Sequence, residues 1–139
     1  MITPLTTKGK IFFFIPLGLI GILLIYSWIV FLTSPNVAVL THYLGLLLFL
    51  PIIYFLYKDK TFKKAIVLTG VYLILGTINL LSFLPFIMTS SWGITIGSLN
   101  IWTPRLNGFA LVLLLIYSIL NFTNLVDIYH DYKETNGTL

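Results

Sequence analysis

Four long stretches without an acidic or basic residue occupy most of this chain, and each is built mainly of Ile, Leu, Val and Phe. The first, 11–32, reaches roughly 33 Å as a helix at about 1.5 Å per residue, which is enough to cross a bilayer. Water is a poor solvent for such segments because they have no polar face to turn toward it. The pattern predicts an all-α integral membrane protein.

The expected architecture is a four-transmembrane-helix antiparallel bundle that forms a single membrane domain, 1–139. Spans are predicted at 11–32, 35–57, 64–85 and 104–127, with an outer loop at 86–103 and a tail at 128–139. Within the outer loop, two alternating runs flank Gly97 and Ser98. This pattern predicts a short extracytoplasmic β-hairpin between the third and fourth spans.

The cations predict the orientation. Seven lysines fall on one side of the predicted topology, and Arg105 alone falls on the other: Lys8, Lys10, Lys58, Lys60, Lys63, Lys64 and Lys133. Basic residues favour the cytoplasmic side of a membrane. We therefore expect both termini to be cytoplasmic. The composition, poor in Ala and rich in Ile and Lys, suggests an AT-rich bacterial source and hence the inner membrane.

Several classes of function are disfavoured. The chain has no cysteine, which excludes disulfides, thiolate metal sites and thiol redox chemistry. No acidic or basic side chain lies deep within the four runs, which argues against proton relays and voltage sensors. The net charge of +4 is divided among two tails and one loop, so no basic stripe for nucleic acid results. We expect no cofactor.

An outer polar cluster is the first candidate site. Its members are expected within about two helical turns of the outer interface, where they could line a vestibule: His42, Asn79, Ser82, Arg105 and Asn107. In the alternative interpretation, Asn79 and Asn107 join the third and fourth helices by hydrogen bonds. An inner polar face formed by Asn121, Thr123 and Asn124 lies too deep for lipid exposure and should face protein.

Small residues recur along the third predicted helix at seven-residue spacing, in the pairs Thr69 with Gly76 and Gly70 with Thr77. Such a stripe lets helix backbones approach closely. The contact could form within the bundle or between copies of the chain.

The C-terminal end holds the densest polar chemistry. Asp127, His130, Asp131 and Glu134 share one face if the helix continues. This spacing could supply ligands to a divalent metal. In the alternative interpretation, these residues are a solvated helix end.

Three functions from different classes remain. The first is a non-enzymatic subunit, accessory or immunity-type protein, which binds another membrane protein through its helices and outer loop. The second is an oligomeric channel or carrier for a small solute, with Asn79, Asn107, Asn121 and Asn124 along the path. The third is a membrane-surface enzyme that uses the C-terminal Asp/His/Glu face. The expected partners are the lipid bilayer and either another membrane protein or copies of the chain.

Overall fold

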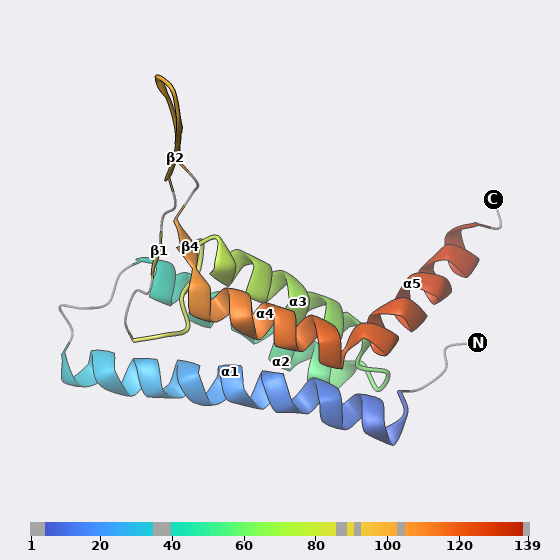
Figure 1. Cartoon of the computed structure of the whole chain (residues 1–139). Helices are drawn as coiled ribbons and strands as arrows, with labels where there is room; N and C mark the ends of the chain where they lie inside the picture. The colour runs from blue at the N-terminus through green and yellow to red at the C-terminus, as the bar shows by residue number, and fades with distance from the viewer. Residues whose placement is uncertain (1–4, 35–39, 86–88, 91–92, 103–104, 138–139) are drawn as a thin grey trace.

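The computed structural model describes residues 5–34, 40–85, 89–90, 93–102 and 105–137, and it is mainly helical (Figure 1). Helices occupy α1 Thr7–Thr33, α2 Leu40–Lys58, α3 Lys63–Thr77, α4 Gly108–Leu120 and α5 Phe122–Asn136. Short strands occupy β1 Thr89–Ser90, β2 Gly93–Ile96, β3 Leu99–Trp102 and β4 Leu106–Asn107. Helices α1 to α4 lie side by side, whereas α5 turns away at the end where the N-terminus lies (Figure 1).

Two of the described helices, α1 and α2, are long and apolar enough to cross a membrane. A third candidate span results if α4 and α5 are counted together as one bent segment. The coarse prediction of a helical membrane protein therefore agrees with the fold. The first residues expected in the second span, 35–39, lie outside the described residues.

Apolar side chains from all four packed helices form one core. Helix α1 begins at Thr7, earlier than its apolar run, because the Thr6 hydroxyl accepts a hydrogen bond from the Gly9 amide at 3.1 Å and caps the helix. The core includes Phe13, Leu17, Ile20, Leu24, Phe49, Ile52, Ala65, Ile66, Tyr72, Leu73, Ala110, Leu113 and Tyr117. The outward faces carry large apolar side chains as well, which suits a lipid solvent.

Helix α3 is shorter than the helix expected over 64–85. It ends at Thr77, because Asn79 takes a left-handed conformation with φ of 61°. The Asn79 amide donates to Gly76 O and the Leu80 amide donates to Leu75 O, which is a Schellman cap. Segment 78–85 then runs as turns and bends, and Leu81, Phe83 and Leu84 remain buried in the core.

Helix α4 is shorter at both ends than the helix expected over 104–127. Leu106 and Asn107 are extended in β4, and the Asn107 side chain caps α4 by accepting from the Ala110 amide at 3.1 Å. At the other end, the chain bends by 69° near Asn121 and continues as α5. In place of one helix over 104–127, the chain therefore forms two helices, α4 and α5, which meet at this bend.

The strands pair in two short antiparallel ladders. Thr89 lies opposite Asn107 in the first, and Ile96 lies opposite Leu99 in the second, around Gly97 with φ of 63°. Strands β2 and β3 project away from the helices at the end opposite to α5 (Figure 1).

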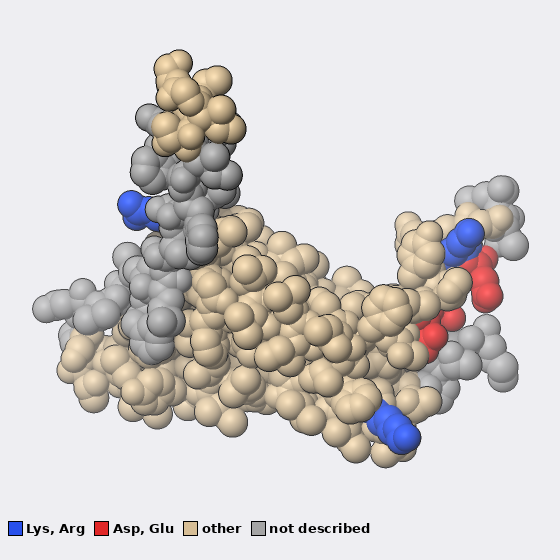
Figure 2. Space-filling view, viewed as in Figure 1, with Lys and Arg blue, Asp and Glu red and all other residues tan. Residues whose placement is uncertain are grey.

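Charged side chains lie near the ends of the helices. On the face shown in Figure 2, the middle of the bundle carries none. Lys8 and Lys63 line one pocket, and Lys58 and Lys64 line a neighbouring one, so the lysines of separate segments gather at one end. Arg105 lies beside β4, near the other end.

Candidate functional site

The non-helical segment after α3 is held by polar groups from two other helices. Ser27 of α1 donates to Phe83 O at 2.9 Å, and His42 Nε2 of α2 lies 3.0 Å from Leu84 O. Because a carbonyl oxygen can only accept, Nε2 carries the proton in this contact. The Ser82 amide donates to Thr41 O at 2.9 Å. The buried backbone groups that lack helical hydrogen bonds are thus satisfied by the protein itself.

Gly45 of α2 permits this arrangement. A Cβ at Gly45 would collide with the carbonyl oxygen of Ser82, which is backbone and cannot rotate aside. On the same helix turn, the Tyr72 hydroxyl donates to Gly45 O at 3.0 Å and joins α3 to α2. Gly45, Tyr72 and Ser27 were not among the predicted site residues. The only signal was the presence of Gly, Ser and Tyr within otherwise aliphatic runs.

The five residues of the predicted outer cluster do not converge on one shared group. His42 and Ser82 both contact Leu84 O, the latter through its hydroxyl at 3.3 Å. The Asn79 amide group donates to the main-chain oxygen of Arg105, while Asn107 caps α4. Asn79 therefore joins the segment after α3 to the main chain before β4, whereas Asn107 caps its own helix in this contact.

The small-residue stripe on α3 makes contacts within the chain. A Cβ at Gly76 would lie 3.1 Å from the Phe83 ring and 3.6 Å from Ala110 Cβ, and one at Gly70 would lie 3.5 Å from the Tyr117 ring. The hydroxyls of Thr69 and Thr77 donate to carbonyls one turn earlier on α3, Ala65 O and Leu73 O, at 2.8 Å each. The stripe thus lets α3 approach α4 and the segment that follows α3.

At the lysine-rich end, Asn121 and Asn124 join the bend between α4 and α5 to α1. The Asn121 amide group donates to Phe12 O at 3.1 Å and to Tyr117 O at 3.2 Å. The Asn124 amide group donates to Gly9 O at 3.1 Å and to Asn121 Oδ1 at 3.0 Å. Both asparagines are buried, so the prediction that they face protein is confirmed, whereas Thr123 is exposed. The Tyr117 hydroxyl also donates to Ile66 O at 2.5 Å.

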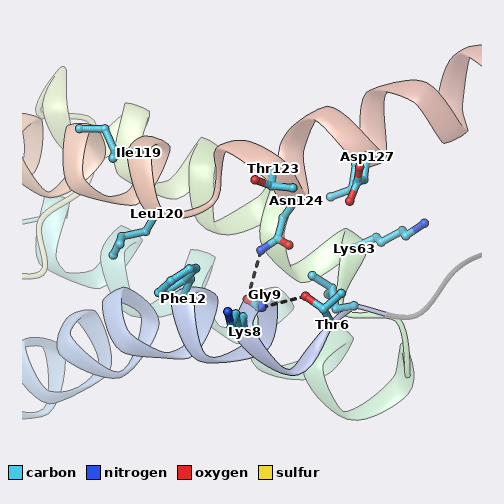
Figure 3. Close-up of a pocket in the computed structure, with 12 residues that line it drawn as sticks. Thr6, Lys8, Gly9, Phe12, Lys63, Ile119, Leu120, Thr123, Asn124 and Asp127 are labelled. Carbon is cyan, nitrogen blue, oxygen red and sulfur yellow. Dashed lines mark hydrogen bonds between the residues drawn. The ribbon is translucent and has the colours of Figure 1, made fainter.

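A pocket of about 480 Å³ opens beside this bend (Figure 3). Phe12, Ile119 and Leu120 supply its apolar wall, while Lys8 and Asp127 bring charges of opposite sign to its lining. Asn124 reaches across it to Gly9 (Figure 3). An amphipathic group suits such a lining, with its apolar part against Phe12 and its polar part near Lys8.

The C-terminal Asp/His/Glu face does not form a metal centre. All four residues are described, and no group of three or more His, Asp or Glu side chains placed to hold a metal ion occurs among the described residues. Asp131 instead forms an ion pair with Lys63 at the start of α3. The metal hypothesis fails because one helix alone spreads these ligands along its axis, and the facing side chain is a cation.

The loop between α2 and α3 is organised by Asp59, which was not among the predicted site residues. Its carboxylate accepts from the Thr61 amide at 2.9 Å and from the Thr61 hydroxyl at 2.6 Å. Burial alone would raise the pKa of the Asp59 carboxyl, but these hydrogen bonds, the Lys64 amide and the Lys64 charge together hold the pKa below its ordinary value.

Searches with this chain against models of protein families, curated proteins and solved structures found no match.

Proposed function

We propose that this protein is a small non-enzymatic subunit or accessory protein, which binds another membrane protein through its helices and the tip of its β2–β3 hairpin. The proposal rests on the exposed apolar side chains at the tip of this hairpin. Ile96 and Leu99, which face each other across the turn, are 65% and 67% exposed. Both lie on strands that extend away from the helices (Figure 1). Apolar side chains presented together on a projection are typical of a contact surface.

The buried polar groups support this proposal over a channel. Asn121, Asn124 and His42 bind backbone carbonyl oxygens of their own chain. Asn107 caps a helix. The polar groups that line a solute path must be available to bind the solute. The groups named here already form hydrogen bonds that stabilise the fold.

The proposal includes four crossings of a bacterial inner membrane, with both termini and the α2–α3 loop in the cytoplasm. Helix α3, with 15 residues, spans about 22 Å, less than the roughly 30 Å hydrocarbon thickness. Segment 78–84, of which residues 81–84 are buried, continues the same crossing. Its hydrogen bonds to α1 and α2 make a non-helical stretch tolerable there.

Photocrosslinking in membranes of the source cells tests the proposal. A photoreactive amino acid at Leu99 is expected to give one adduct of constant mass with a different protein, and Ile96→Asp should abolish it. The matched control is the same amino acid at Lys60, an exposed position in the α2–α3 loop, which should give no such adduct. Absence of a protein adduct at Leu99 would refute the proposal, and an adduct with a second copy of the chain would favour the oligomeric channel.

A further inference from the structure

Helix α5 carries an apolar face that the rest of the described chain does not cover. Phe122 and Tyr129 are 67% and 62% exposed, and Val126 lies between them at helical spacing. Helix α4 also has exposed apolar side chains. The last large one is Ile119, which is 75% exposed and precedes Phe122 by three residues. Large exposed apolar side chains therefore occur on both sides of the bend.

The adjoining face of α5 is polar. Asp127, His130, Asp131 and Glu134 recur at spacings of three and four residues, which places them together on one side of a helix. Acidic side chains gather along one side of α5 in Figure 2. Because Asp131 pairs with Lys63, the polar side is fixed relative to the lysine-rich end of the bundle.

The bend lies at the depth where the apolar part of α1 begins. Asn121 binds Phe12 O and Asn124 binds Gly9 O, both at 3.1 Å. Phe12 belongs to the uncharged stretch, whereas Gly9 lies between Lys8 and Lys10, the last cations before it. Lysines at the end of a spanning helix mark the boundary between headgroups and acyl chains. Helix α5 therefore leaves the bundle at this boundary.

From these observations we propose that α5 lies in the plane of the membrane interface at the lysine-rich end, with Phe122, Val126 and Tyr129 among lipid headgroups and upper acyl chains. If α4 follows the membrane normal, the 69° bend brings α5 close to the membrane plane. Amphipathic helices with aromatic residues on the apolar face bind interfaces in this way. Lys133 follows Tyr129 on the same side, where its ammonium can reach lipid phosphate.

Site-directed spin labelling tests the proposal, since the full chain has no cysteine of its own. Single variants Val126→Cys, Tyr129→Cys and Lys133→Cys report the apolar side, and Asp127→Cys and Glu134→Cys report the polar side. Each labelled protein is placed in vesicles of phosphatidylethanolamine and phosphatidylglycerol. Collision rates with oxygen, which concentrates in lipid, and with a water-soluble nickel complex are then measured. Circular dichroism confirms that every variant remains helical.

An interfacial α5 predicts that the three labels on the apolar side have similar ratios of oxygen to nickel collision, each several-fold higher than the ratios at Asp127 and Glu134. A helix that points away from the membrane predicts instead that the ratio falls steadily from Val126 to Lys133, and this result overturns the proposal. Low collision rates with both reagents at Tyr129 would mean that protein covers this face, which also overturns it.

Discussion

At the scale of single residues, Gly45 is the position at which a small change should have the largest effect. In Gly45→Ala, the new methyl group meets the Ser82 carbonyl, so α2 and segment 78–85 must separate. Overpacking of this kind costs about 1–3 kcal/mol. We expect the variant to unfold at a lower temperature than the unmodified protein. Thermal unfolding in detergent, monitored by circular dichroism, measures this difference.

Gly18→Ala is the matched control, because a Cβ at Gly18 meets no atom within 4 Å. Alanine is the better helix former, so this variant should be unchanged or stabilised by up to about 1 kcal/mol. Equal destabilisation by both substitutions would contradict the close approach of Ser82 to Gly45.

Asn121 carries the second residue-scale prediction. Asn121→Leu removes the hydrogen bonds to Phe12 O and Tyr117 O and the acceptor for Asn124. Hydrogen bonds between helices in membranes are worth about 0.6–2 kcal/mol each, so a loss of stability of that order is expected in chemical unfolding of the protein in mixed micelles. Thr123→Val, at an exposed position of the same bend, should leave the unfolding midpoint nearly unchanged. If the two variants unfold alike, the bend is not held by Asn121.

At the scale of elements, the α2–α3 loop should respond to acid. The folded pKa of Asp59 is lowered, so its stabilising contribution is present above the ordinary pKa of aspartate and is lost as pH falls through the lowered folded value. The amide resonance of Thr61, which donates to Asp59 at 2.9 Å, reports this titration by NMR in micelles. Its midpoint should lie below that of a free aspartate. The titration should disappear in Asp59→Asn, and a midpoint at or above the ordinary value would contradict the loop geometry.

The apolar runs predicted which segments become helices, but they did not predict where the helices stop. Uncharged residues continue past Thr77 and past Leu120, so no charged residue marks the ends of α3 and α4. Those ends depend on tertiary contacts: Asn79 in a left-handed cap joined to Arg105 O, and Asn121 joined to Phe12 O. The asparagines were identified as polar residues needing partners, but their partners are backbone carbonyls. Carbonyls are present at every position and therefore leave no mark in a sequence.

The same reason explains why the candidate sites were only partly predicted. The burial of Asn121 and Asn124 followed from their depth in an apolar run. The metal hypothesis on α5 failed because spacing along one helix shows which residues share a face, but not that Lys63 of another helix lies opposite Asp131.

At the scale of the whole molecule, the number of crossings determines on which side each loop lies. Single variants Lys60→Cys, Ser98→Cys and Thr135→Cys place one thiol in the α2–α3 loop, at the hairpin turn and near the end of α5. All three positions are exposed. With four crossings, a membrane-impermeant maleimide should label Ser98→Cys in spheroplasts, in which the outer face of the inner membrane is accessible. Lys60→Cys and Thr135→Cys should react only after the membrane is permeabilised.

The physical reason is the distribution of charge, because seven lysines and all four acidic residues belong to the two tails and the α2–α3 loop, and the hairpin side holds only Arg105. Labelling of Ser98→Cys and Lys60→Cys from the same side would mean that α3 and segment 78–85 do not complete a crossing. The third helix would then be a re-entrant element whose non-helical end, capped by Asn79 and bound by Ser27 and His42, turns back within the bundle. The hydrogen bonds to Phe83 O and Leu84 O would serve in both topologies, so only the side on which Ser98 reacts distinguishes them.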